Sequence, residues 1–127
     1  MSTSRRLDHF GTSILLIDLG GRDREDMLRR IAEMREAVAA CAPDSALVLT
    51  DCTRSFLDDE VIRVLGEAVA ANKLSVRASA VVGLSPKRQE LRQLIAGMAA
   101  REIHPFEDME LAMDWLAEQG RAAGGTA

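Results

Sequence analysis

The spacing of hydrophobic residues changes several times along this chain, and each change marks a new structural element. Near-continuous apolar runs of strand length occupy residues 13–19, 46–50 and 76–83. Such runs are typical of central strands whose two faces are both buried. Between them, apolar residues recur every three or four positions, which is the period of one helical face. The pattern therefore predicts buried strands that alternate with amphipathic helices.

About four helices are expected from this period. Pro43 ends the first, the second ends near Asn72, the third starts at Ser85-Pro86, and Gly120 is expected to stop the last, which covers residues 107–119. The residues expected to face the core, helix by helix, are Met27, Ile31, Met34 and Val38; Val61 or Ile62, Leu65, Ala68 and Val69; Leu91, Leu94, Ile95 and Met98; and Leu111, Ala112, Trp115 and Leu116.

Two weaker segments complete the predicted sheet. Residues 7–10 are expected to pair with residues 13–19 as a hairpin across Gly11-Thr12. Residues 103–106 form a short strand that Pro105 places at an edge. Strands that alternate with helices imply right-handed crossovers and a mostly parallel sheet. We predict one α/β domain over residues 1–120, with an open, mostly parallel sheet of four to five strands and about four helices. Residues 121–127 are expected to be a disordered tail.

Composition weakens several functional classes. The chain has 127 residues, which suits a single domain with one core, and its formal net charge is −4. Its aromatic residues are three phenylalanines and one tryptophan. Nucleic-acid phosphates favour a basic surface, and single-stranded bases stack on several exposed rings. We therefore expect no nucleic-acid partner.

Cysteine usage and apolar run length indicate a cytoplasmic protein. Cys41 and Cys52 form neither a metal-binding cluster nor a disulfide framework. No apolar run reaches the ~18 residues that a membrane span requires, and the first ten residues lack the apolar stretch of a secretory signal. We expect reduced thiols, no metal and no membrane span.

Polar residues gather where the predicted parallel strands end. The carboxyl ends of parallel strands share one edge of a sheet, so the loops after Asp18, Asp51 and Gly83 should be neighbours. The residues expected along this edge are Asp18, Asp51, Thr53, Arg54, Ser55, Asp58, Asp59, Ser85 and Lys87.

Enzymatic interpretations of this edge lack the groups they need. A phospho-acceptor at Asp51 would need an acidic pair after the first strand, where only Asp18 stands. A phosphatase would need a second aspartate two residues after the first, and Thr53 occupies that position. Spaced glycines and a lysine for a phosphate cradle are also missing. No nucleophile, base and oxyanion donors can be assembled, so we expect neither an enzyme nor a cofactor.

The third predicted helix breaks a local electrostatic rule. Lys87 and Arg88 follow Ser85-Pro86, where the positive end of the helix dipole disfavours cations. One explanation is a pairing with Asp58 or Asp59 across the edge. The other is a contact for an anion or an acidic partner, because local violations cluster at functional sites.

Four segments together resemble a known signalling family. They are SILLIDLGG, ALVLTDCTRSFLDDEVIRVL, VRASAVVGLSPKRQEL and HPFEDMELAMDWLAEQ. In order and spacing, residues 13–119 resemble the SpoIIAA-like domains, also called STAS or STAS/SEC14-type domains. The last two segments are most similar to small stand-alone bacterial members of poorly defined function. The resemblance implies a SpoIIAA-like α/β fold.

The resemblance also implies a protein switch without its usual acceptor. Anti-sigma-factor antagonists of this family are phosphorylated on a serine that follows an aspartate at the start of a helix, and the added charge prevents binding. The resemblance places that aspartate at Asp58 and the acceptor at Asp59 or Glu60, neither of which has a hydroxyl. Thr53 and Ser55 are the remaining hydroxyls, although the S-x-x-D spacing of Ser55 and Asp58 is typical of a helix cap.

The sequence therefore favours a non-catalytic regulatory domain that binds a protein partner. The expected binding residues are Asp51, Thr53, Ser55, Asp58, Asp59, Glu60, Lys87 and Arg88. The SEC14 side of the resemblance implies an alternative, a carrier of a small apolar ligand or lipid in a cavity beneath the helices, for which the six methionines offer adaptable walls. A homodimer through apolar residues of the second or last helix also stays open.

Overall fold

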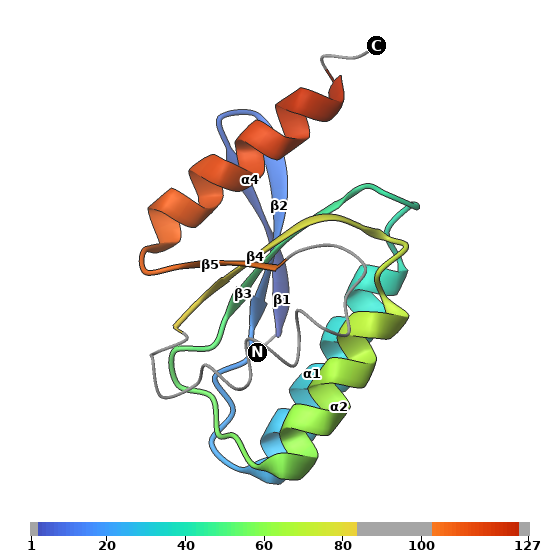
Figure 1. Ribbon diagram of the computed structural model, residues 1–127, viewed down its shortest axis with the longest axis vertical. Coiled ribbons are helices and arrows are strands. Elements are labelled where there is room, and N and C mark those ends of the chain that lie inside the picture. Colours follow the sequence, from blue (N-terminus) through green and yellow to red (C-terminus); the bar gives the residue numbers. More distant parts are fainter. Residues whose placement is uncertain (1–2, 84–102, 125–127) are drawn as a thin grey trace.

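The strands of this protein follow one another across the sheet in the same order as along the chain. The computed structural model describes residues 3–83 and 103–124, and these form a five-stranded sheet (Figure 1). β1 is antiparallel to β2, and the pairs from β2 to β5 are parallel. The strands are β1 (Ser4–His9), β2 (Thr12–Asp18), β3 (Ala46–Asp51), β4 (Val76–Val82) and β5 (Ile103–Phe106).

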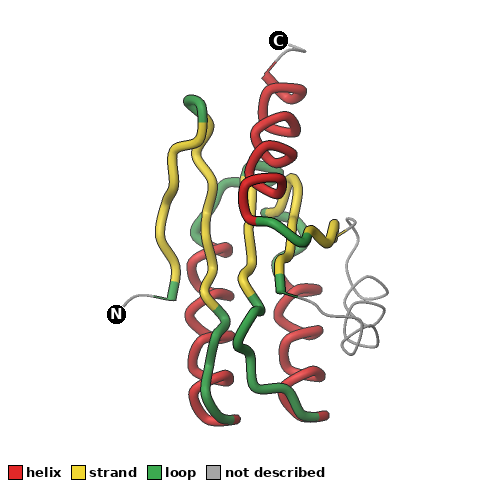
Figure 2. The backbone as a smooth tube through the Cα atoms, turned by 90° about the vertical axis from the view of Figure 1, so that its left-hand side faces the viewer, coloured by secondary structure: helices red, strands yellow, loops and turns green. Residues whose placement is uncertain are grey.

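Helices cover both faces of the sheet. The crossover helices α1 (Arg24–Ala39) and α2 (Asp59–Ala71) lie side by side on one face, whereas α4 (Met109–Gly124) lies on the other (Figures 1 and 2). Successive right-handed crossovers in one direction along a sheet place their helices on the same face. The prediction of a mostly parallel α/β sheet is confirmed. The helix expected after Ser85, together with Lys87 and Arg88, lies outside the described residues.

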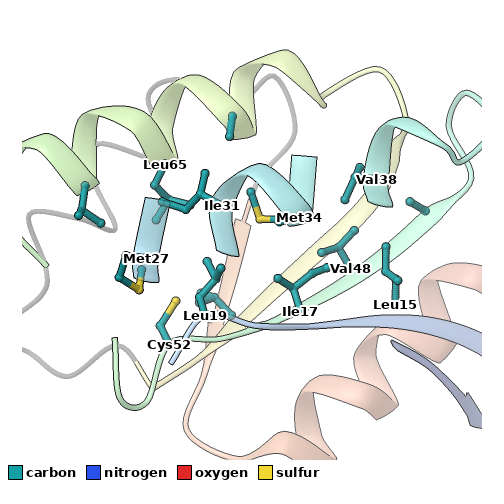
Figure 3. Packing of buried hydrophobic residues seen from close by; sticks show 14 residues of the cluster. Leu15, Ile17, Leu19, Met27, Ile31, Met34, Val38, Val48, Cys52 and Leu65 are labelled. Atoms are coloured by element: carbon teal, nitrogen blue, oxygen red, sulfur yellow. The ribbon is translucent and has the colours of Figure 1, made fainter. Parts of the chain in front are cut away.

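Each central strand contributes side chains to two separate cores. Leu15 and Ile17 of β2 point towards α1 and α2, while Ile14 and Leu16 point towards α4. This alternation follows from the two-residue period of a strand, and it explains why the central strands are apolar at nearly every position. Figure 3 shows the core beneath α1 and α2, in which Met27, Ile31, Met34 and Val38 meet Leu15, Ile17 and Val48.

The inward faces expected for α1 and α2 are largely confirmed. All four apolar residues predicted for α1 are buried. In α2, Val61, Leu65 and Ala68 are buried, and Ile62 and Val69 pack against the same core while partly exposed. The C-cap of α2 is Asn72, close to the predicted end. Hydrophobic period alone thus predicted these two helices because each buries one continuous stripe.

The predicted hairpin between the first two strands is confirmed, but its turn lies at Phe10-Gly11 and not at Gly11-Thr12, because His9 lies opposite Thr12. Its two central residues, Phe10 and Gly11, have φ angles of 52° and 81°. Two positive φ values in a two-residue loop define the type I′ turn, whose twist matches that of the flanking strands. The phenylalanine is 82% exposed, so the turn displays an aromatic side chain at its tip.

The last helix corrects two predictions. Leu111 is 59% exposed instead of buried, since Ala112 and Leu116 form the inward stripe with Gly120. Gly120 does not stop the helix, which continues to Gly124, so residues 121–124 belong to the helix and not to a disordered tail. A Cβ at position 120 would lie 2.9 Å from Cδ1 of Leu47. This glycine therefore permits close packing against the sheet.

β5 lies at the edge of the sheet, as Pro105 predicted. Trp115 of α4 is partly buried and packs on the rings of His104 and Phe106, at centroid distances of 4.3 and 5.7 Å. These ring contacts attach α4 to the edge strand. Among the helices in residues 3–83 and 103–124, none has the length and apolar character needed to cross a membrane.

Candidate functional site

The loops after β2 and β3 and the glycine after β4 form one continuous edge, which we call the loop edge (residues 19–23, 52–58 and Gly83). Asp18 lies opposite Asp51, and Asp51 lies opposite Val82 in the parallel register. The N–H of Leu19 donates to the carbonyl of Asp51 at 3.0 Å. The predicted meeting of these strand ends is confirmed.

Two hydrogen bonds join the first two loops beyond the sheet. The N–H of Phe56 donates to the carbonyl of Gly21 at 2.9 Å, and the Ser55 hydroxyl donates to the carbonyl of Leu19. Ser55 is buried, with 4% of its surface exposed. Because a buried carbonyl without a partner is costly, this hydroxyl holds the two loops together.

The expectation that Ser55 caps α2 is wrong. The N-cap is Asp58, whose Oδ1 accepts from the N–H of Val61 at 2.8 Å. Leu57 and Ile62, at positions that suit a hydrophobic staple, both pack against the core beneath α1 and α2. The spacing of Ser55 and Asp58 suggested a cap, but the helix begins one turn later and the serine lies inside the loop.

Asp51 and Thr53 form a locally satisfied turn. Oδ1 of Asp51 accepts from the N–H of Thr53 at 3.0 Å and from its hydroxyl at 2.6 Å. Gly83 lies directly beneath, with φ at 86°, and a Cβ there would be 2.3 Å from the Thr53 nitrogen. The turn can therefore take this position only over a glycine. Thr53 itself is exposed, unlike Ser55.

Arg24 neutralises part of the expected acidic patch. Its Nε lies 2.7 Å from Oδ2 of Asp58 and 3.3 Å from Oε2 of Glu60. The pKa of Asp58 is lowered by the bond from the Val61 N–H and then by Arg24, and the pKa of Arg24 is raised by Asp58. Asp59 is exposed and forms no ion pair with another described residue.

The edge is mixed in charge instead of uniformly negative. The exposed Arg22 and Arg54 lie on the two loops. The loops are close together here, because a Cβ added at Gly20 would be 3.7 Å from Cβ of Arg54. Arg30 of α1 extends to the end of β2, where its Nη1 is 3.1 Å from the carbonyl oxygen of Asp18. Charges of both signs therefore surround the loops.

Asp26 anchors the amino end of α1 below this edge. Its carboxylate accepts from Arg29 at 2.6 Å and from the N–H of Arg22 at 3.2 Å. The Arg29 bond, followed by the Arg22 N–H, lowers the pKa of Asp26 to about 2. The sequence interpretation missed this network, although aspartate and arginine three and four residues apart on a helix are a recognisable signal.

Phe56 is the feature of this edge that the sequence interpretation did not select. Its side chain is 38% exposed, between the buried Ser55 and the partly buried Leu57. An aromatic residue inside a polar strand-to-helix loop was the available signal. Partly exposed aromatic residues on rigid loops are frequent anchors in protein interfaces.

Histidine and carboxylate side chains do not gather into a metal site within the described residues. Within residues 3–83 and 103–124, no cluster of three or more histidine, cysteine, aspartate or glutamate side chains could hold a metal ion. His9 is hydrogen-bonded to Asp114 at 2.7 Å, and both residues are distant from Asp51 in the sequence. His104 stacks on Trp115. Neither histidine belongs to the loop edge.

A small cavity lies between the sheet and the pair formed by α1 and α2. Its volume is about 50 Å³, and its walls are mostly apolar. The lining residues are Met34, Val38, Val48, Thr50, Val69, Asn72, Lys73, Val76, Ser79 and Ile103. Pockets that hold drug-sized ligands are typically about 300–1,000 Å³, so the cavity is too small for a lipid in this conformation.

Comparison with known proteins supports the fold. No protein-family model matches this sequence, and no curated protein matches it significantly. Among solved structures, the chain is similar to an uncharacterised protein of the DUF3478 family, with a SpoIIAA-like fold, from Shewanella loihica PV-4. The match has 17% sequence identity and a TM-score of 0.68, and it covers 89% of this chain and 91% of the other. The fold of this protein is SpoIIAA-like, as the sequence resemblance implied.

Proposed function

We propose that this protein is a non-catalytic regulatory domain that binds a protein partner through its loop edge. The observation that carries the proposal is the position of Phe56. The residue is 38% exposed, while its own N–H is bonded to the carbonyl of Gly21 and the neighbouring Ser55 is buried. An anchor held by a preorganised backbone loses little conformational entropy on binding.

The surrounding charges would give the interface its specificity. Asp59 and Glu60 are exposed at the start of α2, and Arg22 and Arg54 are exposed on the loops. Charges at the rim of an interface steer association and disfavour wrong partners. Asp51, Thr53 and Asp58 shape this surface, and Lys87 and Arg88 stay part of the prediction.

The proposed switch carries its negative charge permanently. Carboxylates stand at positions 59 and 60, where the family resemblance places the acceptor serine. Of the two remaining hydroxyls, Thr53 is exposed and Ser55 is buried. We therefore expect an unmodified protein, and intact-mass measurement after purification from the native host under several growth conditions checks it. A phosphate on Thr53 would contradict the permanent charge.

The proposal is tested by quantitative affinity capture from the native host. Replacing Phe56 with alanine should abolish capture of the specific partner, and Asp59→Lys should weaken it. Phe10→Ala is the matched control, because this phenylalanine is 82% exposed at the tip of the β1–β2 hairpin and not on the loop edge. Equal capture by wild type and Phe56→Ala, with unchanged melting temperatures, would contradict the proposal.

The alternative function is transport of a small apolar ligand. The apolar cavity beneath α1 and α2 supports it, although at about 50 Å³ the cavity would have to expand. Native mass spectrometry of freshly purified protein distinguishes the two functions. A bound lipid mass would favour the carrier, whereas a ligand-free protein agrees with the interaction domain.

A further inference from the structure

The outer edge of the sheet at β1 presents backbone groups that point away from the protein. β1 ends the strand order and pairs only with β2 among the described strands (Figure 2). The N–H of Asp18 donates to the carbonyl of Thr3 at 2.8 Å, and Thr3 lies opposite Asp18 in the hairpin register. Antiparallel hydrogen-bonded pairs alternate along a strand. The N–H and C=O groups of Arg6 and Asp8 therefore point to the open edge.

We propose that a second copy of this chain pairs antiparallel with β1, so that two sheets join into one across a two-fold axis. A two-fold axis perpendicular to the sheet keeps α1 of both copies on the same face. Two residues can then be opposite only if they lie on the same face of β1, as Arg6 and Asp8 do. Both side chains are exposed, and Nη2 of Arg6 is 3.3 Å from Sγ of Cys41 at the end of α1.

The charges of β1 select one register from the few that symmetry allows. In one register, Arg6 lies opposite Arg6 of the second copy. In another, Asp8 lies opposite Asp8 of the second copy. Like charges directly opposite each other destabilise a strand pair. In the third register, Arg6 lies opposite Asp8 of the second copy. By symmetry, Asp8 also lies opposite Arg6 of the second copy. Each such pair exchanges both of its outward N–H···O bonds.

The other face of the strand is complementary in the same register. Leu7 lies on the two-fold axis opposite Leu7 of the second copy, and it already packs beside the core beneath α4. Arg5 lies opposite His9 of the second copy. His9 is bonded to Asp114, whose carboxylate side chain is 56% exposed. The second copy thus places an arginine beside an accessible acid.

This interface differs from the loop edge and from the helical surfaces predicted to dimerise. Charged residues on an edge strand usually prevent pairing with other chains. Here the opposite charges of Arg6 and Asp8 disfavour the registers that place like charges opposite each other, and they favour a single register. The occupant is therefore a second copy of this chain, because its strand carries the complementary sequence by symmetry.

Sedimentation equilibrium over a wide concentration range tests the proposal. The wild type should show a monomer–dimer equilibrium, and Asp8→Arg should raise the dissociation constant at least about tenfold, because both attractive pairs become repulsive. The double variant Arg6→Asp, Asp8→Arg should restore the dimer. Asp59→Arg, on the loop edge, is the control and should leave it unchanged. A chain that stays monomeric at every concentration, or a dimer insensitive to Asp8→Arg, would overturn the proposal.

A cysteine cross-link tests the register independently. In a Cys41→Ser background, Leu7→Cys should form a disulfide-linked dimer with oxidised glutathione, since residues on the axis form a close, non-hydrogen-bonded pair. Arg5→Cys should not cross-link, because Arg5 of one copy lies opposite His9 of the other. Circular dichroism melting establishes that each variant is folded. Cross-linking of both variants to the same extent would contradict this register.

Discussion

At the scale of single residues, the backbone of the loop edge depends on two residues that other residue types could not replace without loss. Ser55 uses its hydroxyl to join two loops, and Gly83 leaves space for the turn formed by Asp51 and Thr53. Both fix the backbone on which Phe56 is displayed, so their replacement should disturb stability and binding together.

Gly83→Ala is expected to destabilise the protein by about 2–4 kcal/mol, as the sum of a strained positive φ and a backbone clash with Thr53. Urea unfolding measures the change. Gly11→Ala is the matched control, since Gly11 also has positive φ, at 81°, but a Cβ there would have no neighbour within 4 Å. Its cost should be about 1 kcal/mol. Equal losses in both variants would show that the contact with Thr53 is unimportant.

At the scale of elements, each described helix is defined by a buried stripe and, in α1 and α2, by an aspartate at its start. Asp23 and Asp58 are the N-caps, and Asp26 and Arg24 add side-chain contacts in the first turn of α1. These contacts involve titratable carboxylates, so pH should affect them more than it affects the apolar cores. The stripe of α4 differs from the predicted one by placing Leu111 outside.

Acid should destabilise the amino ends of α1 and α2. The pKa of Asp26 is about 2 in the folded protein, against about 3.9 for an unfolded aspartate, and the pKa of Asp58 is also lowered. The contribution of Asp26 is complete above its unfolded pKa and is lost as pH falls from about 4 towards about 2, and the contribution of Asp58 is likewise lost on acidification. Unfolding free energies of Asp26→Asn should change less steeply across this interval than those of wild type. An identical slope would contradict the assignment.

Two leucines of α4 should respond differently to truncation. Leu116 is fully buried, so Leu116→Ala should cost about 2–5 kcal/mol by loss of burial and creation of a cavity. Leu111→Ala should stay within about 0.5 kcal/mol of wild type, because the side chain is 59% exposed. Chemical denaturation of both variants measures the difference. A larger loss for Leu111 would mean that α4 is rotated.

At the scale of the whole molecule, the two proposed surfaces occupy different parts of one sheet. The loop edge lies at the carboxyl ends of the parallel strands, while the proposed dimer interface runs along the outer edge of β1. Partner binding and self-association should therefore be independent. Phe56→Ala should abolish partner capture without changing the dimer, and Asp8→Arg should do the reverse. If either variant removed both properties, the two surfaces would have to be coupled through the sheet.

The sequence by itself determined most of the described elements and most of their buried faces. Helical and strand periods are local, so the stripe from Met27 to Val38 and the apolar β3 could be recognised without any tertiary contact. The edge position of β5 followed from Pro105, which lacks an N–H. The approach of Asp18 and Asp51 followed from parallel topology alone.

Only the tertiary structure decided which groups satisfy one another across those elements. Ser55 donates to a carbonyl 36 positions away in the chain, and Arg24 reaches Asp58 from another helix. Gly120 lies inside a helix, where the absence of a Cβ leaves room for Leu47 of the sheet. From its sequence neighbours alone, Ser55 would be read as a helix cap, Arg24 as a surface charge and Gly120 as a helix stop. A partner distant in sequence changes that role, because the free energy of a buried contact depends on proximity in space.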